Sequence, residues 1–139
     1  MAFTAAFGTL LKKGDGASPE VFTSIAQVGG FSGVNQKADT IDITTHNQAN
    51  AYKAFTAGLL EGGEVKFPIF FDAANATHSG LVTTFEARVA VNWQLVPPFS
   101  PAAKWSFSGL LIDIGHKYEL NGAIMADITI KVSGKPTLA

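Results

Sequence analysis

Two stretches of this sequence, Thr40-Ile41-Asp42-Ile43-Thr44 and Glu64-Val65-Lys66-Phe67-Pro68-Ile69-Phe70-Phe71, decide the fold. In both, apolar residues recur at every second position, as in a β-strand that buries one face. Between them, residues 45–63 form a connection of 19 residues with little core-forming pattern. Compact domains rarely keep so long a loop unless it has a function. We therefore expect the 45–63 connection to serve assembly with other copies of the chain.

The composition points to one domain that contacts other subunits. The chain has 139 residues, of which 47% are hydrophobic and only 15% charged. This is apolar for a small monomer, so part of the apolar surface is expected between subunits. We expect a single domain over 1–139, with an N-terminal arm at about 1–8 and a C-terminal tail at about 133–139.

Several protein classes are disfavoured by the same numbers. The chain has no Cys, so disulfides and thiolate sites are excluded. No apolar run is long enough for a transmembrane helix, and neither a membrane partner nor a signal peptide is expected. A net charge of −1 argues against a protein that binds nucleic acid by neutralising phosphates.

Strands dominate the remaining pattern. We predict about seven strands, at residues 8–12, 21–33, 40–44, 64–71, 89–96, 104–114 and 124–132. One α-helix is predicted over 76–88, capped by Asn75. One or two helical turns are predicted within 51–60, because Tyr52, Phe55 and Leu59 fall at i, i+3 and i+7. The expected architecture is mostly β: a two-sheet antiparallel sandwich or barrel with one flanking α-helix.

No chemistry of a known active site is evident. His46, His78 and His116 lack the spacing of metal ligands, and there is no Cys to join them. The glycine-rich run 29–33 is not followed by a helix, so we interpret it as a bend rather than a phosphate loop. The sequence predicts no enzyme, no cofactor and no metal site.

Six short motifs in order carry a family resemblance. They are Gly8-Thr9-Leu10 leading to residues 14–20 with Phe22; residues 39–44; Ala57-Gly58-Leu59 with Gly63-Glu64-Val65; Phe71-Asp72 then Ala76-Thr77-His78; residues 105–109; and residues 128–136. Together they resemble the major tail tube protein of long-tailed, non-contractile bacteriophages of the lambda type. Two segments depart from the pattern: residues 47–51 lack an expected Pro-Gly, and residues 96–103 are unusually rich in Pro.

The resemblance implies a ring-forming β-sandwich that acts as a structural virion protein. Hexameric rings would stack into the tail tube, with sheets of neighbours closing one barrel around a lumen through which DNA leaves without specific binding. It implies partners such as the tape measure, tail tip and terminator proteins, a place in the virion tail, and assembly in the host bacterial cytoplasm. Two alternatives stay open: a ring protein of the type VI secretion kind, and a monomeric β-sandwich binding module.

Two sets of site residues follow from this expectation. Inter-ring contacts are predicted for one set in the long connection: Thr45, His46, Asn47, Tyr52, Phe55 and Leu59. The alternative is that the apolar members pack on their own subunit. Lumen-facing carboxylates form the second set: Asp39, Asp42, Glu64 and Asp127. The alternative there is an ordinary solvated face, and Lys66 on the same face as Glu64 weakens the lumen interpretation for that strand.

Overall fold

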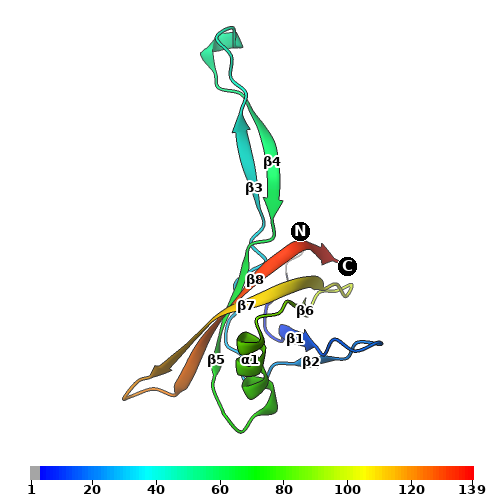
Figure 1. Cartoon of the computed structure of the whole chain (residues 1–139), viewed down its shortest axis with the longest axis vertical. Coiled ribbons are helices and arrows are strands. Elements are labelled where there is room, and N and C mark those ends of the chain that lie inside the picture. The colour runs from blue at the N-terminus through cyan, green and yellow to red at the C-terminus, as the bar shows by residue number, and fades with distance from the viewer. Residues whose placement is uncertain (1–3) are drawn as a thin grey trace.

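The computed structural model describes residues 4–139 and consists of a β-rich body from which one long hairpin projects (Figure 1). Residues 1–3 of the predicted N-terminal arm lie outside the described residues. The strands are β1 (Leu10–Gly14), β2 (Phe22–Ser24), β3 (Lys37–Asp42), β4 (Phe55–Glu61), β5 (Glu64–Phe70), β6 (Val91–Val96), β7 (Trp105–Tyr118) and β8 (Ile124–Leu138). One α-helix, α1 (Ala76–Ala87), and one short 3-10 helix, η1 (Ala49–Ala51), complete the chain. The mostly β, antiparallel architecture with one flanking α-helix is confirmed.

The body is a six-stranded antiparallel sheet that closes on itself. Its strand order is β2-β1-β6-β7-β8-β5. The chain leaves β2 at one edge and crosses to the opposite edge, where Val28 and Ser32 bridge to Ile69 and Lys66 of β5. The Gly29 and Ser32 N–H groups each donate to a β5 carbonyl at 2.8 Å. Residues 25–32, here called the closing segment, therefore turn the sheet into a small irregular barrel and cover the edge of β5.

The core lies inside this barrel because the strands point alternate residues inward. Its largest fully buried side chains include Trp93, Leu11, Ile69 and Ile128. The indole Nε1 of Trp93 donates to the Gly109 carbonyl at 3.2 Å, so the polar atom of the largest core residue is satisfied.

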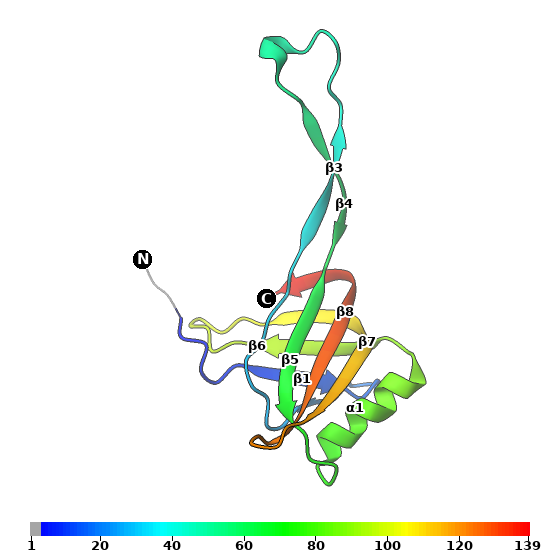
Figure 2. The ribbon, with the colours of Figure 1, turned by 90° about the vertical axis from the view of Figure 1, so that its left-hand side faces the viewer.

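Helix α1 packs beside the end of the barrel that lies away from the hairpin (Figure 2). Asn75 caps it by accepting from the Thr77 N–H at 2.9 Å, as predicted. His78 and Leu81 are buried, whereas Phe85 is 39% exposed. His78 is fully buried and bridges two segments, accepting from the Asp72 N–H at 3.0 Å and donating from Nε2 to the Ala26 carbonyl at 2.6 Å.

The predicted helical turns within 51–60 are wrong. Residues 55–61 form strand β4, which pairs antiparallel with β3, and only η1 at 49–51 is helical. The pairing shifts register between Ala38 and Thr40 of β3, where a bulge interrupts the ladder. Such a bulge disturbs the alternation along β4, and this is why the spacing of its apolar residues resembled a helix.

Candidate assembly surface

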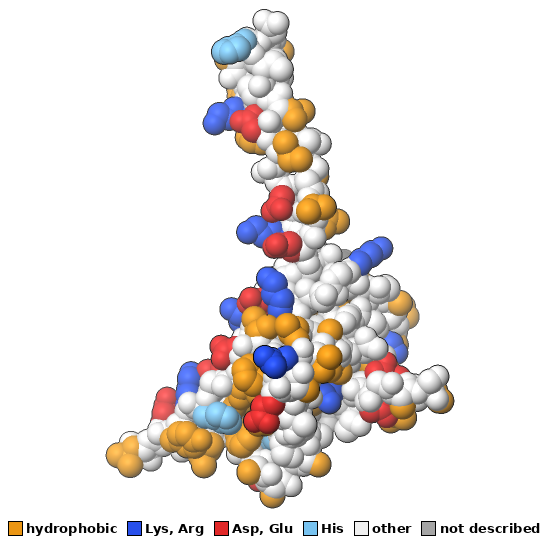
Figure 3. Space-filling view, in the orientation of Figure 1, with side chains coloured by type: hydrophobic (Ala, Val, Ile, Leu, Met, Phe, Trp, Pro, Cys, Tyr) orange, Lys and Arg blue, Asp and Glu red, His pale blue; other side chains and the backbone are white. Residues whose placement is uncertain are grey.

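The hairpin built from β3, the turn and β4 is exposed on both faces. We call residues 37–61 the arm and residues 43–54 the arm tip; Figure 1 shows the arm extending away from the body. Every residue of β3 is exposed, and six large apolar side chains of the arm are between 51% and 81% exposed: Ile41, Ile43, Tyr52, Phe55, Leu59 and Leu60. Figure 3 shows hydrophobic side chains distributed along the arm. An isolated two-stranded hairpin is marginally stable in water, so this arm requires contacts from outside its own subunit.

The arm tip is closed by a small set of hydrogen bonds around Thr44. Asp42 Oδ1 accepts from the Thr44 N–H at 2.9 Å, and Thr44 Oγ1 accepts from the Ala54 N–H at 2.8 Å. Hydrogen bonds from the Thr44 side chain, and secondarily from its N–H, lower the pKa of the Asp42 carboxyl. Asp42 is therefore ionised at neutral pH and holds the turn that begins the tip.

Close backbone packing fixes the arm to the body at its base. Gly62 is buried against Val132, and Gly63 has a φ of +77° with its Cα facing the Asn35 carbonyl. The Val132 N–H donates to the Gly63 carbonyl at 2.9 Å. No side chain fits in the space at Gly63, and a positive φ favours glycine. The base is thus a tightly packed junction.

The predicted contact residues lie on this arm. Thr45, His46 and Asn47 lie in the arm tip and are exposed, Tyr52 follows η1, and Phe55 and Leu59 lie on β4. Sequence reasoning missed Ile41, Ile43 and Leu60, which are equally exposed. The alternation of Ile41 and Ile43 was interpreted as a core-facing pattern, whereas their side chains project outward within this subunit. An excess of apolar residues over what one barrel can bury was the available signal.

The four predicted lumen carboxylates do not form one cluster. Asp39 and Asp42 lie on the arm, whereas Glu64 and Asp127 lie on the body strands β5 and β8. Glu64 is 3.4 Å from Lys66 Nζ. Asp127 is 2.9 Å from Lys117 Nζ and raises the pKa of that lysine. Two of the four charges are thus compensated locally, while Asp39 and Asp42 form no ion pair with the described residues.

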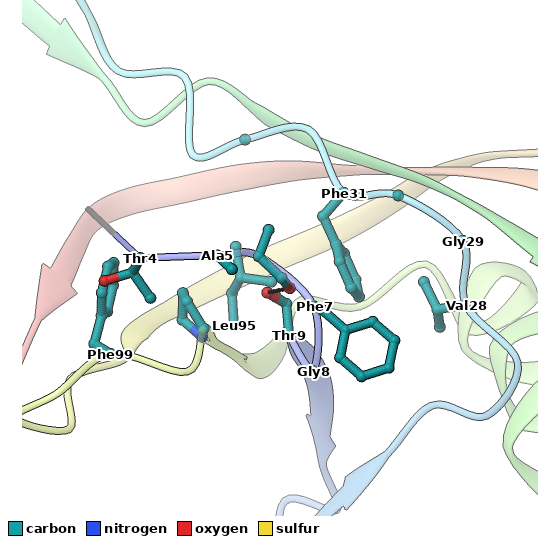
Figure 4. Close-up of a pocket in the computed structure, with 14 residues that line it drawn as sticks. Thr4, Ala5, Phe7, Gly8, Thr9, Val28, Gly29, Phe31, Leu95 and Phe99 are labelled. Carbon is teal, nitrogen blue, oxygen red and sulfur yellow. Dashed lines mark hydrogen bonds between the residues drawn. The ribbon is translucent and has the colours of Figure 1, made fainter.

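A hollow lies at the mouth of the barrel near the base of the arm. It has a volume of about 550 Å³ and is lined mainly by apolar residues and glycines, including Phe7, Phe31, Leu95 and Phe99 (Figure 4). None of its lining residues is acidic, basic or His. Among residues 4–139, no group of three or more His, Asp or Glu residues could hold a metal ion. No helix of that part is long and apolar enough to cross a membrane.

Comparison with known proteins gives a consistent result. Residues 9–104 match the family described as "Phage tail tube, TTP, lambda-like". No curated protein sequence matches the chain.

Solved structures share the fold at low identity. A chain from the virion of a native gene transfer agent particle aligns with a TM-score of 0.79 and 14% identity, covering 99% of both chains. A chain from the tail of an empty gene transfer agent particle with C6 symmetry aligns with a TM-score of 0.78 and 17% identity, covering 94% of this chain and 95% of that one. The SPP1 tail tube aligns with a TM-score of 0.68 and 9% identity, covering 94% of this chain and 74% of that one.

Proposed function

Because the chain belongs to the lambda-like phage tail tube family, a family of structural proteins, we propose that it forms rings of six that stack into a tube through which DNA leaves the virion. The C6 symmetry of a structurally similar tail supports the ring size. The observation that carries the proposal is the arm, whose two faces are exposed in the isolated subunit. Self-assembly supplies the missing contacts.

In this proposal the arm joins one ring to the next. Tyr52, Phe55 and Leu59 supply apolar contact area, and the exposed polar residues Thr45, His46 and Asn47 surround it. Ordering an arm costs about 1–2 kcal/mol of conformational entropy per residue, and the contacts offset this cost only when a neighbour is present. The arm thereby makes polymerisation depend on an existing ring.

Free strand edges support closure of each ring. Beyond Val132, whose N–H donates to the Gly63 carbonyl, β8 pairs only with β7, but this part contains Gly134, Lys135 and Pro136, which disfavour a further strand. Residues 55–60 of β4 contain neither a charge nor a Pro, and this strand has one partner among the described strands. An edge of this kind pairs readily with another chain, so we place a contact between ring neighbours here.

We expect the triple substitution Tyr52→Ala, Phe55→Ala and Leu59→Ala to abolish tubes and leave a folded monomer. The three side chains are 76%, 56% and 81% exposed, so their loss removes little packing within the subunit. Sedimentation and negative-stain microscopy measure tubes, and thermal unfolding monitors the fold. A matched triple at exposed residues outside the arm, Val21→Ala, Val89→Ala and Phe99→Ala, should keep its tubes. Tubes of normal length from the arm variant would contradict the inter-ring role.

For the lumen, we propose that Asp39 and Asp42 carry the negative charge and that Glu64 and Asp127 contribute little. The support is the local pairing of the latter two with Lys66 and Lys117. Duplex DNA carries one negative charge per about 1.7 Å of its axis, so a wall with uncompensated carboxylates repels it and a wall of lysines would retain it.

Two substitutions of Asp42 compare the effect of its charge with the effect of its hydrogen bond in the turn. Asp42→Asn keeps the oxygen that accepts from the Thr44 N–H at 2.9 Å but removes the charge, whereas Asp42→Lys reverses the charge. We expect Asp42→Lys, which also loses the acceptor for the Thr44 N–H, to lower phage infectivity about tenfold or more and to impair DNA delivery more than assembly, and Asp42→Asn to have a smaller effect. Plaque titres and electron microscopy of tails measure the two quantities. Unchanged infectivity of Asp42→Lys would exclude Asp42 as a lumen determinant.

The same function predicts further partners and a location. We propose that the tube assembles in the host bacterial cytoplasm, on a tape measure protein and a tail tip, and that a terminator ends it.

The structure of an extracellular contractile injection system, in a sheath and tube terminator complex, also shares this fold, with a TM-score of 0.72 and 9% identity. The alternatives of a secretion-type ring protein and a monomeric binding module therefore stay open to test. Long hollow filaments from the purified protein support the tail tube, isolated or loosely stacked rings a secretion ring, and dispersed monomers a binding module.

A further inference from the structure

The hairpin of β7 and β8 forms a second projection, distinct from the arm. Pairing of β8 with β5 ends at Met125 and Phe70, and beyond the Phe71 N–H, which donates to the Ile124 carbonyl, the hairpin end pairs only with itself among the described strands. We call residues 117–124 the ribbon tip. Its apolar side chains are Tyr118, Leu120 and Ile124, which are 73%, 100% and 50% exposed. A fully exposed Leu in a turn next to a Tyr–Ile cross-strand pair is an apolar surface without a partner in the subunit.

The ribbon tip is held firmly at its root. The Phe71 ring contacts the His116 ring edge-on with centroids 4.8 Å apart, and His116 stacks on Tyr118 at 6.3 Å. The Phe71 N–H donates to the Ile124 carbonyl at 3.0 Å. The apolar end of the hairpin is therefore presented in a defined position, as a preorganised docking surface requires.

The arm tip and the ribbon tip lie at opposite ends of the molecule. Both views place the arm at one end of the long axis and the hairpin of β7 and β8 at the other (Figures 1 and 2). Figure 3 shows orange side chains gathered at this lower projection. Head-to-tail stacking requires two different complementary surfaces at opposite ends of one copy, and this arrangement provides them.

The charges of the two tips are complementary. Lys53 is the only charged residue of the arm tip, apart from His46. At the ribbon tip, Lys117 pairs with Asp127, which lies on β8 just outside the tip, at 2.9 Å, so Glu119 is the charge of the tip that has no ion pair among the described residues. The excess charge there is negative, and it resides on Glu119. Opposite charges on facing surfaces guide association and select orientation.

We propose that the ribbon tip of one copy is the docking surface for the arm tip of a second copy in the adjacent ring. Tyr52 of the arm tip and the adjoining Phe55 of β4 would pack against Leu120 and its neighbours, with Lys53 facing Glu119. The inference rests on the proposed tube function and names the receptor for the arm within it.

A charge-swap cycle tests the polar part of the contact. Lys53→Glu and Glu119→Lys should each raise the protein concentration needed for tube formation by about tenfold, because one weakened contact recurs at every copy in the ring interface. The double variant restores the opposite charges in reversed order and should recover assembly. Both residues lie on exposed turns, so thermal unfolding should not change. A double variant that assembles no better than the worse single variant would contradict the pairing.

Cross-linking tests proximity directly, because the chain has no Cys. Tubes grown from an equal mixture of Tyr52→Cys and Leu120→Cys chains should give a disulfide-linked heterodimer on oxidation, since a disulfide requires Cα atoms within about 7 Å. A mixture of Tyr52→Cys with Phe7→Cys is the control, because Phe7 is 97% exposed but lies at the mouth near the base of the arm. Normal tubes without the heterodimer, or with equal cross-linking to Phe7→Cys, would overturn this contact alone. Absence of tubes from the parent chain would instead contradict the proposed function, and this contact with it.

Discussion

Replacing Gly63 with Ala is expected to lower the free energy of unfolding by about 3 kcal/mol or more and to prevent tube formation. The backbone at Gly63 has a φ of +77°, which costs a residue with a Cβ about 1 kcal/mol or more. A Cβ at this position would also collide with the Asn35 carbonyl, which belongs to the other strand entering the arm. The collision is with backbone, so no side-chain rotation relieves it.

The expected consequence is a displaced arm as well as a weaker fold. Asn35 leads into β3 and Gly63 leads out of β4, so separating them changes the direction in which the arm leaves the body. The Gly63 carbonyl also accepts from the Val132 N–H at 2.9 Å, which ties the junction to β8. Arms that leave at altered angles cannot reach equivalent positions on a neighbouring ring.

Two glycines provide controls that separate the causes. Gly134 has a φ of +81° but open space around it, so Gly134→Ala carries the conformational cost without the collision. Gly80 lies in α1 with open space, and Gly80→Ala should stabilise the protein by about 1 kcal/mol. Denaturant unfolding of the three variants should rank them Gly80→Ala, Gly134→Ala, Gly63→Ala in decreasing stability. If Gly63→Ala is as stable as Gly134→Ala, the backbone at the base of the arm adjusts to the added Cβ and the collision carries no cost.

The sequence was most informative where one face of an element is buried. The alternation along residues 64–71 predicted β5 to within one residue, because Val65, Phe67 and Ile69 point into the barrel. Asn75 predicted the start of α1 because a helix end has N–H groups that a side chain must satisfy. These signals are local and each follows from one environment.

Residues 55–61 were assigned wrongly because the arm lacks that environment. A two-residue period arises when one face meets a core and the other meets water, and β4 buries neither face in its own subunit. The bulge opposite Ala38 and Thr40 further disturbs the alternation. Without a buried face to fix the alternation, the apolar residues Tyr52, Phe55 and Leu59 fall at a spacing that resembles a helix.

The position of the closing segment and the contacts of His78 could not be predicted from the sequence, for a different reason. The glycines at 29–33 predicted a bend in the strand that begins near Val21, but not that the chain would cross to β5. The crossing segment is held by backbone hydrogen bonds to β5 and by a contact between His78 and Ala26, which are 52 residues apart in sequence. One histidine in a sequence gives no sign of such a partner, and the spacing of His78 from the other histidines showed only that a metal site is not expected.

His78→Leu is the second substitution with a large expected effect, lowering the free energy of unfolding by about 2–4 kcal/mol. Leu fills a similar apolar space but leaves the Asp72 N–H and the Ala26 carbonyl without the partners they have now, at 3.0 Å and 2.6 Å. Each polar group left unpaired in a site that excludes water costs about 1–3 kcal/mol. The Phe71 ring, stacked on His78 at 5.8 Å, also loses its polar neighbour.

The location of the destabilised amides distinguishes a residue that holds the closing segment from one that only packs in the core. His78 holds the closing segment, so in the Leu variant the Gly29 and Ser32 amides, which now donate to β5 at 2.8 Å, should exchange with solvent faster than amides of β6 and β7. Leu81→Ala, at a buried neighbour on α1, is the matched control and should weaken the fold without this local preference. If amide exchange is accelerated uniformly across the sheet in both variants, His78 contributes only core packing. Selective acceleration at Gly29 and Ser32 would mean that the His78 imidazole holds the closing segment over the edge of β5.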